Sequence, residues 1–375
     1  MRIAINTRLL LPHKLDGIGW FTAETSKRMA QLHPEHTFYF LFDRKPAPDF
    51  IGMDNIVPLV LYPQARHPIL WQLFFEVAVP AALRKHHIDV LLSPDGMIPL
   101  HTTVPTLSVI HDLNFAHQQG VIRRSHQQYM NHFYPRFAKK STRIATVSEY
   151  SKSDIAATYG IEHRKIDVVY DGSHNDYRPY SDEEKAAIRR HYTNGSPYLI
   201  FVSTILKRKN LQGLLRAFDL VRQDDTRNLK LVVVGHRSWW GEELSKVYDT
   251  MQYRDDVIML GRVDSDKLSG LLSASEALVY PSYFEGFGIP ILEAMYAETA
   301  VICSNTTSMP EVGGDAVLYC DPSSEDSIAH AIRQLRDATL RNELIAKGRV
   351  QREKFSWDKT ANLLWASLMQ TVNQA

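Results

Sequence analysis

The chain has 375 residues, 44% of them hydrophobic and 23% charged, with a formal net charge of +1. This is the composition of a globular protein long enough for two domains, and the near-zero charge argues against a nucleic-acid partner. The only cysteines, Cys303 and Cys320, lie in apolar runs, so neither a disulfide framework nor a cysteine-based metal site is indicated.

The charges are distributed unevenly along the chain. Residues 1–170 hold 19 Lys and Arg against 14 Asp and Glu, and 12 of the 16 His. A mildly basic first half suits an acidic partner or a membrane surface, and an ordinary solvated surface explains it as well. The first apolar run, MRIAIN, is short, and no window reaches about 18 apolar residues, so we expect neither a signal peptide nor a membrane span. We expect a cytoplasmic protein.

In the first half, β-rich runs alternate with amphipathic helical stretches, the pattern of a parallel sheet covered by helices on both faces. Strands are predicted at 2–6, 37–42, 56–62, 89–94, 106–112, 143–148 and 165–171. Helices are predicted at 19–32, 70–86, 123–139 and 150–159. The fold class is therefore α/β.

The same alternation starts again in the second half. Residues 173–196 are charged and rich in turn residues, which predicts a connection that contains a helix. Strands follow at 198–204, 229–235, 257–261, 277–282, 300–304 and 317–320, with helices at 210–223, 241–252, 266–274 and 289–297.

These patterns predict two doubly wound, Rossmann-like domains. The N-terminal domain covers 1–172, a linker covers 173–196, and the C-terminal domain covers 197–357, with a last helix at about 358–375 that packs back on the N-terminal domain. Open α/β sheets bind ligands beyond the carboxyl ends of their strands. We therefore expect the site in a cleft across which the two domains face each other.

A glycine loop follows the first strand and ends in Gly17-Ile18-Gly19. Small residues at a helix N-terminus let its free amides approach an anion, so this loop is a candidate phosphate site. Thr22 stands where a dinucleotide-binding loop would have its third glycine. A plain tight turn explains the two glycines as well.

A basic loop opens the second domain. Lys207, Arg208 and Lys209 lie between a strand and a helix whose predicted cap is Asn210. Cations at the carboxyl end of a strand are well placed to neutralise a diphosphate, and a solvated basic turn is the alternative.

The stretch SYFEGFGIPILEAM, residues 282–295, is the most informative in the chain. Gly286 and Gly288 let backbone amides approach a ligand at the positive end of the next helix, which favours a phosphate. Glu285 and Glu293 flank this turn. A carboxylate beside a phosphate is stabilised when it accepts from the hydroxyls of a vicinal diol, which suggests one glutamate per sugar. Helix-capping charge is the alternative.

The pair Asp264 and Asp266 resembles an Asp-x-Asp metal site of other sugar transferases. It directly precedes a predicted helix, so we interpret Asp264 as the cap and Asp266 as a first-turn acid. We expect no metal and no other cofactor.

The motifs YPSYFEGFGIPILEAM and VICSNTTSMPEVGGDAVLYCDP resemble the nucleotide-sugar signature of the retaining glycosyltransferases of family 4, the glycosyl transferases group 1. That family has the two-lobed GT-B fold. Further matches extend in order over nearly the whole chain, at DGIGWFT, VIHDLNF, ATVSEYSKSDI, VVYDG, STILKRKN and FSWDKTANLLWASL. The likeness is strongest to bacterial mannosyltransferases of surface polysaccharide assembly.

The resemblance implies roles for the matching residues. Glu285 would contact the donor sugar, Glu293 the nucleotide ribose, and Arg208 with Lys209 the diphosphate. His111 matches a histidine near the transferred sugar, although "HD" after a strand is also a loop cap. The remaining donor-binding positions are Gly17, Gly19, Gly286, Phe287, Gly288 and Ile289.

The chain departs from the family pattern in two places. Val202-Ser203 stands where many members have a glycine followed by an arginine. We therefore expect binding of the diphosphate to depend more on Arg208 and Lys209. Residues 297–300 read Ala-Glu-Thr-Ala where relatives have a glycine and a proline, so the turn after the signature helix differs.

The resemblance implies a metal-independent, retaining enzyme that moves a sugar from a nucleotide diphosphate to a hydroxyl of a glycan or lipid-linked acceptor. The leading donor is GDP-mannose, and UDP-sugars remain open. The family's front-face chemistry would use the leaving phosphate to help deprotonate the acceptor.

A lipid-linked acceptor would bring the protein to the inner face of the membrane. Residues 123–143 mix cations with aromatics, as does a helix that contacts an anionic membrane, or a packed helix with one wet face.

Two other classes of function share features with this sequence. A nicotinamide-dependent oxidoreductase would need the glycine fingerprint and a following acidic residue, which this chain lacks. A non-catalytic nucleotide-sugar-binding protein would keep the binding motifs and lack turnover.

Overall fold

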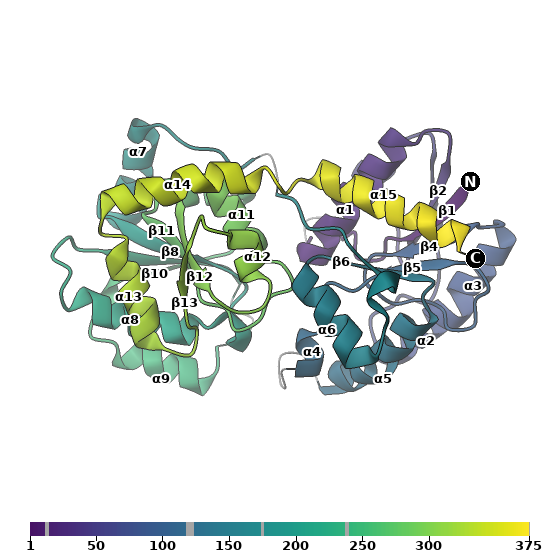
Figure 1. Ribbon diagram of the computed structural model, residues 1–375, viewed down its shortest axis with the longest axis horizontal. Coiled ribbons are helices and arrows are strands. Elements are labelled where there is room, and N and C mark those ends of the chain that lie inside the picture. The colour runs from purple at the N-terminus through teal and green to yellow at the C-terminus, as the bar shows by residue number, and fades with distance from the viewer. Residues whose placement is uncertain (12–14, 118–123, 174–175, 237–239, 375) are drawn as a thin grey trace. The chain divides into compact units, whose positions relative to one another are not determined.

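The computed structural model describes the chain except for residues 12–14, 118–123, 174–175, 237–239 and 375 (Figure 1). The chain divides into two compact units. Unit 1 comprises Met1–Asp171 and Trp357–Ala375, and unit 2 comprises Gly172–Ser356. Each unit contains one parallel sheet.

The described part of unit 1 forms a seven-stranded parallel sheet in the order β3-β2-β1-β4-β5-β6-β7. The strands are β1 (Arg2–Asn6), β2 (Thr37–Phe42), β3 (Ile56–Val60), β4 (Val90–Ser93), β5 (Thr106–Val109), β6 (Arg143–Thr146) and β7 (Ile166–Val168). Five of the predicted strands run one to three residues too far at their carboxyl ends. The chain leaves the sheet there, although Ile110, Val147 and Val169 stay buried and keep the apolar pattern of a strand.

The helices of unit 1 follow the predicted alternation. They are α1 (Gly17–Leu32), α2 (Pro68–Leu73), α3 (Val79–Lys85), α4 (Asn114–His117), α5 (Arg124–Lys140), α6 (Glu149–Tyr159) and α15 (Trp357–Asn373), with short 3-10 turns at Pro48–Phe50 and His163–Lys165. The predicted helix 70–86 is divided by a π-helical segment, η2 (Phe74–Ala78). Pro80 has no N–H to donate to the preceding turn, which fits a widened turn at this point. The predicted start of α5 at residue 123 lies outside the described residues.

The two faces of the unit 1 sheet carry different helices. α2, α3, α5 and α6 share one buried cluster with the strands, which includes Phe74, Phe75 and Phe137. α15 packs against α1 and against strands β4, β5 and β6 (Figure 1). The last helix of the chain is therefore a structural part of unit 1.

The described part of unit 2 forms a six-stranded parallel sheet in the order β10-β9-β8-β11-β12-β13. The strands are β8 (Tyr198–Val202), β9 (Lys230–Val234), β10 (Val257–Gly261), β11 (Ala277–Tyr280), β12 (Ala300–Ser304) and β13 (Leu318–Cys320). The helices are α7 (Asp182–Thr193), α8 (Leu211–Arg222), α9 (Glu242–Thr250), α10 (Ser265–Ala274), α11 (Ile289–Tyr296), α12 (Met309–Gly313), α13 (Glu325–Gln334) and α14 (Ala338–Arg352), with 3-10 turns η4 (Lys207–Lys209) and η5 (Arg254–Asp256).

The segment expected as a linker is packed within unit 2. Its helix α7 lies against α10, Tyr180 N donates to Ser273 Oγ at 2.9 Å, and Arg189 Nε donates to Ala274 O at 2.8 Å. These contacts make the described part of 173–196 a fixed layer over α10, because several backbone and side-chain groups are bound along its length.

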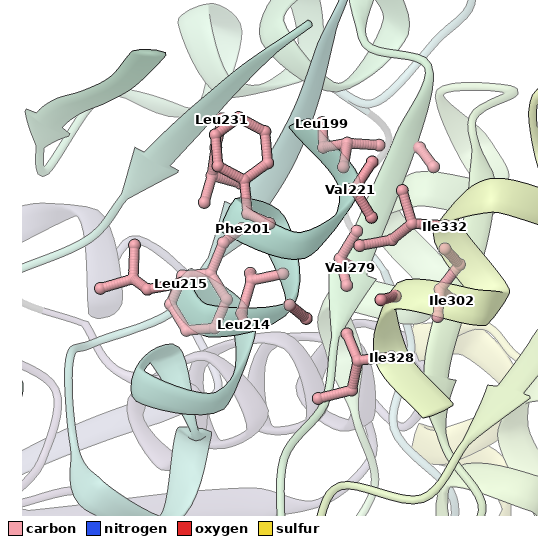
Figure 2. Close-up of a cluster of buried hydrophobic side chains, with 14 of the residues drawn as sticks. Leu199, Phe201, Leu214, Leu215, Val221, Leu231, Val279, Ile302, Ile328 and Ile332 are labelled. Atoms are coloured by element: carbon pink, nitrogen blue, oxygen red, sulfur yellow. The ribbon is translucent and has the colours of Figure 1, made fainter. Parts of the chain in front are cut away.

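The core of unit 2 lies between the sheet and helices α8 and α13 (Figure 2). Phe201 of β8 and Val279 of β11 meet Leu214 of α8 and Ile328 of α13 in this cluster. Each fully buried Leu, Ile, Val or Phe side chain stabilises the fold by about 1.5–3 kcal/mol. This packing fixes β8 and β11, whose carboxyl ends lead into the two loops with the strongest sequence signals.

The order of the strands defines where a ligand would bind in unit 2. From β8 the chain goes to β9 and β10, and it then returns to place β11 on the other side of β8. The connections that follow β8 and β11 therefore diverge, and such a switch point leaves a crevice beyond the carboxyl ends of the two strands.

Candidate functional site

The basic loop after β8 is held firmly by its neighbours. Lys207, Arg208 and Lys209 form the short 3-10 turn η4, and Asn210 follows with a φ of 58°. Asn210 Oδ1 accepts from Gly213 N at 3.1 Å, and Asn210 Nδ2 donates to Pro322 O at 2.7 Å. The predicted cap of α8 is confirmed, and it ties the basic loop to the chain beyond β13.

Two of the three cations converge on Glu285. Lys209 Nζ lies 2.5 Å from Glu285 Oε1, and Arg208 Nη1 lies 2.9 Å from Glu285 Oε2. Tyr280, the last residue of β11, accepts from Lys209 Nζ at 2.7 Å and donates to Glu285 Oε1 at 2.8 Å. Lys207 instead lies 3.5 Å from Glu243 at the surface. The strand order thus brings Arg208, Lys209 and Glu285 into one cluster.

This cluster is buried and carries excess positive charge. Glu285 is 6% exposed and Lys209 8% exposed. Burial raises the pKa of Glu285, but the charges of Arg208 and Lys209 outweigh it and bring the pKa to about 2. Two cations therefore face one ionised carboxylate, and positive charge in a poorly solvated place attracts an anion.

The turn after Glu285 is fixed by the residues that precede α12. Glu285 N donates to Thr307 Oγ1 at 3.2 Å. Ser308 Oγ lies 2.9 Å from the carbonyl oxygen of Glu285 and 2.8 Å from that of Phe287. The Phe287 ring is 3% exposed and meets Phe355 edge to face at 5.4 Å. The Phe287 side chain therefore anchors the turn from the inside of unit 2.

Gly288 allows the chain to enter α11. Its φ is 111°, which an L side chain rarely adopts, and an added Cβ would lie 3.2 Å from Ile291 Cδ1. Ile289 begins the helix, with Pro290 in its first turn, and Gly286 is buried just before it. The amides and the positive dipole end of α11 therefore start at the Gly-Phe-Gly turn, as predicted.

Glu293 is in a different electrostatic state from Glu285. It lies one turn into α11, partly buried, and its side chain is hydrogen bonded to Tyr177. Burial raises the pKa of Glu293 to about 7, and the hydrogen bond with Tyr177 opposes this rise only in part. Near neutral pH, Glu285 is fully ionised whereas Glu293 is divided between its two protonation states.

Gly17 and Gly19 lie in unit 1, in the first turn of α1, which begins two residues earlier than predicted. Asp16 caps this helix, and its Oδ1 accepts from Gly19 N at 2.9 Å. A Cβ on Gly19 would lie 3.0 Å from Leu15 Cδ2, whereas a Cβ on Gly17 would meet nothing within 4 Å. Close packing and the cap explain Gly19, whereas among the described residues nothing lies close to the position of a Cβ on Gly17.

His111 also lies in unit 1, two residues after the end of β5. Its Nε2 is 2.9 Å from Pro94 O. Because a carbonyl only accepts, Nε2 carries the proton, and Nδ1 of the neutral ring is an acceptor. Burial lowers the pKa of His111 and so favours this neutral form. Asp112 is the residue that stabilises the following loop, by accepting from Asn114 N at 2.9 Å.

Sequence reasoning missed a buried polar network at the switch point of unit 1, between β1 and β4. Arg8 Nε donates to Asp95 Oδ2 at 2.6 Å, and Asn6 Nδ2 donates to Asp95 Oδ1 at 2.9 Å. Both Arg8 and Asp95 are less than 9% exposed. Polar residues directly after two strands were the available signal, but only the strand order shows that β1 and β4 are neighbours.

Three residues of unit 2 that support the glutamates were also missed. Tyr280 and Ser308 lie inside the signature motifs, where an aromatic at a strand end and a serine before a helix have no special pattern. Tyr177 comes from the expected linker. Their roles depend on contacts between segments far apart in the chain, which spacing cannot reveal.

Over the described ranges, no cluster of three or more His, Cys, Asp or Glu side chains is arranged to hold a metal ion. Asp264 occupies the cap position of α10 and Asp266 its first turn, as predicted, although the Asp264 side chain accepts no capping hydrogen bond. Cys303 and Cys320 are buried free thiols in β12 and β13.

Comparison with known proteins gives family matches over both units. Residues 15–177 match the family described as Glycosyltransferase Family 4, and residues 183–351 match Glycosyl transferases group 1. The chain is 31% identical over 294 residues to the O-antigen chain mannosyltransferase B of Escherichia coli, a match that covers 78% of this chain and 75% of that protein. It is 30% identical over 304 residues to the O-antigen chain mannosyltransferase RfbU of Salmonella typhimurium, covering 79% and 80%.

The fold is shared with solved structures at lower identity. HepE of Anabaena, solved in complex with UDP-glucose, superposes with a TM-score of 0.75 at 16% identity, covering 99% of this chain and 100% of that one. Two parallel-sheet units with these family matches define the GT-B architecture. The chain belongs to the group 1 glycosyltransferases of family 4 and has their GT-B fold.

Proposed function

We propose that this glycosyltransferase moves mannose from GDP-mannose to a hydroxyl of a glycan or lipid-linked acceptor in cell-surface polysaccharide biosynthesis, with retention of anomeric configuration. The observation that carries the proposal is the buried cluster of Arg208, Lys209 and Glu285 beside the N-terminus of α11. The choice of mannose is supported by the names of the two bacterial relatives, both O-antigen mannosyltransferases.

Arg208 and Lys209 are proposed to bind the diphosphate of the donor. Hydrogen bonds to Glu285 already hold both side chains in place without a ligand. Donor binding therefore costs little side-chain conformational entropy at these two residues. The amides of Gly286, Phe287, Gly288 and Ile289 and the dipole of α11 add to the same positive field. These charges stabilise the leaving diphosphate without a metal ion.

The two glutamates are proposed to bind hydroxyls. Glu285 Oε2 accepts from Arg208 Nη1, and because a carboxylate oxygen has two lone pairs, we propose that it also accepts from a hydroxyl of the transferred sugar. Glu293 is proposed to accept from the ribose hydroxyls. Its pKa of about 7 means that ribose binding, which favours the ionised form, should release protons near neutral pH.

The proposed reaction forms a bond between the acceptor oxygen and the anomeric carbon and breaks the bond from that carbon to the phosphate oxygen. The electron pair of the broken bond leaves with the nucleotide diphosphate, which takes the acceptor hydroxyl proton. Attack from the face that the phosphate leaves retains the configuration. Arg208 and Lys209 offset the charge that grows on the diphosphate.

The residues of unit 1 have proposed roles that rest on the family resemblance. His111 would accept a hydrogen bond from a sugar hydroxyl through Nδ1, the atom left as an acceptor by the bond between Nε2 and Pro94 O. Gly17 is a better candidate for close approach to the donor than Gly19, because the Gly19 N–H donates to Asp16 and no described residue lies within 4 Å of a Cβ placed on Gly17.

No helix in the described part of the chain is long and apolar enough to cross a membrane. We propose that the protein acts at the inner face of the membrane through contact with its surface.

Two alternatives remain as outcomes of the same experiment. HepE was solved with UDP-glucose, which favours testing UDP-sugars as donors of this fold. A non-catalytic nucleotide-sugar-binding protein would bind a donor through the same cluster and leave it intact.

The test is to incubate the protein with GDP-mannose, GDP-fucose, UDP-glucose and UDP-galactose, with and without EDTA, and to measure release of the nucleotide diphosphate. We expect slow hydrolysis of GDP-mannose, unchanged by EDTA. Faster hydrolysis of a UDP-sugar would identify that sugar nucleotide as the donor in place of GDP-mannose. Loss of hydrolysis in EDTA would overturn metal independence. Tight binding of a donor without turnover, even with added polysaccharide acceptors, would favour the binding protein. The anomeric coupling in the NMR spectrum of the released or transferred sugar reports retention.

The ribose assignment is tested separately by calorimetry. Glu293→Ala should abolish donor binding or weaken it more than about tenfold, because two hydroxyl hydrogen bonds to a charged group are lost. Glu298→Ala is the matched control, since Glu298 follows α11 and pairs with Arg349 away from the turn. Equal donor affinity in the two variants would refute the assignment.

A further inference from the structure

A cavity of about 560 Å³ lies in unit 1, between helix α1, strand β2 and the connection from β2 to β3. Its most buried lining residues are apolar, and they include Leu10, Phe40 and Ile56, which are 3%, 2% and 7% exposed. Small-molecule sites in proteins span about 300–1,000 Å³. None of the described residues that line the cavity belongs to the proposed donor site, so this space has no role in the function proposed above.

One wall of the cavity is a stripe of α1. Trp20, Glu24, Lys27 and Gln31 line it and follow each other at three- and four-residue intervals, which places them on one side of the helix. Trp20 is partly buried, whereas Lys27 and Gln31 are exposed. This wall therefore combines an aromatic ring with polar groups that lie nearer to solvent.

The facing wall is the connection from β2 to β3. Its 3-10 turn Pro48–Phe50 contributes Asp49 and Phe50 to the lining. Asp49 is exposed and Phe50 is partly buried. Both walls thus offer the same pair of chemistries, an aromatic ring and a polar side chain, over an apolar floor.

The polar groups of the cavity are available to a ligand. In the part of the chain that the structure describes, Lys27, Gln31 and Asp49 make no hydrogen bond and no ion pair. Glu24 differs from them, because its carboxylate is paired with Arg28 one turn further along α1. One ammonium, one amide and one carboxylate can therefore donate to and accept from a bound molecule.

This combination of groups selects a class of ligand. An apolar ligand would cover these polar groups without replacing their hydrogen bonds to water, which costs free energy. An anion would face the carboxylates of Asp49 and Glu24. A neutral sugar meets neither penalty, because its hydroxyls can pair with the polar groups while its C–H face lies against the aromatic rings and the apolar floor.

The cavity is separate from the position of His111. In the sheet of unit 1, β1 and β4 lie between β2, which borders the cavity, and β5, which precedes His111. Three strand spacings amount to about 14 Å. A sugar residue in the cavity is therefore not the one that would meet His111.

We propose that this cavity is a subsite for a hexose residue of a glycan acceptor, remote from the hydroxyl that reacts. Trp20 and Phe50 contact the C–H face of the sugar, and Lys27, Gln31 and Asp49 bind its hydroxyls. The inference rests on the proposed function for the identification of the glycan as acceptor. Binding of the sugar itself requires neither the donor nor turnover.

The test is an NMR titration of the full chain with α-mannotriose, maltotriose and, as an apolar probe, 1-octanol, all without donor. The indole N–H signal of Trp20 is assigned by its loss in Trp20→Phe. We expect this signal to shift with a trisaccharide and to remain in place with octanol. The double variant Lys27→Ala, Asp49→Ala should bind the trisaccharide about tenfold more weakly or worse, because hydrogen bonds to two charged groups are lost.

The matched control is the double variant Lys85→Ala, Asp255→Ala, which removes the same two residue types at exposed positions outside the cavity and should bind as wild type does. Each variant must melt as wild type does, and Gln31→Ala replaces the first double variant if that one fails to fold.

Three results would overturn the proposal. They are a Trp20 signal that neither trisaccharide moves, a shift with octanol alone, which would identify an apolar site, and equal trisaccharide affinity in the two double variants. Because no donor is present, failure of this test is distinct from failure of the proposed reaction.

Discussion

Glu285 and Glu293 are the same residue type eight positions apart, yet their surroundings give them opposite properties. Two cations bring the pKa of Glu285 to about 2, whereas burial raises the pKa of Glu293 to about 7 despite its hydrogen bond with Tyr177. The first is a permanent charge that holds Arg208 and Lys209 in position. The second changes its protonation near neutral pH, so ligand binding and proton release are coupled there.

Glu285→Gln should destabilise unit 2 by about 3 kcal/mol at pH 7, because the folded pKa lies well below the ordinary value of 4.5 and the variant loses this charge interaction. A depressed pKa contributes stability that is complete above about pH 4.5 and is lost as the pH falls toward 2. The difference between wild type and variant in urea unfolding should therefore shrink between pH 5.5 and pH 3.5.

The control for this prediction is Glu298→Gln, which removes an ion pair whose Arg349 partner is 53% exposed. A pair of this exposure contributes less than about 1 kcal/mol. A loss in Glu285→Gln that is equal to the control, or independent of pH, would show that the buried cluster is not held by charge.

At the scale of elements, the basic loop depends on how α8 begins. Asn210 adopts a left-handed backbone, caps α8 through Gly213 and binds Pro322 O. Lys209 precedes it directly and is buried. The start of one helix therefore sets the position of a cation that the sequence assigns only to a loop.

Asn210→Ala should lower the stability of unit 2 by about 2–3 kcal/mol, because it loses the cap and forces alanine into a left-handed conformation. Donor affinity should fall with it, since Lys209 loses its support. Asn228→Ala is a matched control, because Asn228 has a φ of 56° and is exposed on the chain before β9. Chemical denaturation measures the stability of the two variants, and calorimetry measures their donor affinity. Because both variants place alanine in a left-handed conformation, the difference between them reports the contribution of the cap. If Asn210→Ala lost no more stability and donor affinity than Asn228→Ala, this role of Asn210 would be contradicted.

At the scale of the whole molecule, the chain returns to its first unit at its end. α15 buries Trp357, Ala361, Leu364 and Leu368, and Thr360 Oγ1 donates to Tyr170 O at 2.7 Å, across 190 residues of sequence. Unit 1 is therefore complete only after unit 2 has been synthesised, and its stability includes contacts of high sequence separation.

Leu364→Ala should destabilise unit 1 by about 2–5 kcal/mol, because the side chain is fully buried and its removal leaves a cavity. Leu363→Ala, one residue earlier and 43% exposed, should change stability by less than about 0.5 kcal/mol. Hydrogen exchange followed by mass spectrometry should show faster exchange in α1, α15 and β4 to β6 of the Leu364 variant. Increased exchange mainly in unit 2 would contradict the assignment of α15 to unit 1.

The sequence by itself determined the α/β class, the positions of nearly all strands, the cap Asn210 and the membership of a glycosyltransferase family. These features depend on local periodicity, on short motifs and on turn chemistry, which act between residues close in the chain. The same local signals extended strands such as 106–112 too far, because buried apolar residues such as Ile110 continue past the last residue of the strand.

Only the tertiary structure decided what the candidate residues do to each other. It joined Arg208 and Lys209 to Glu285 and Tyr280 across more than seventy residues, placed Tyr177 on Glu293, and made a supposed linker into a layer over α10. It also buried Tyr129, Tyr134 and Phe137 of α5 and left the cations of this helix exposed. Strand order and side-chain direction set all of these contacts, and no spacing within the sequence encodes which strands become neighbours.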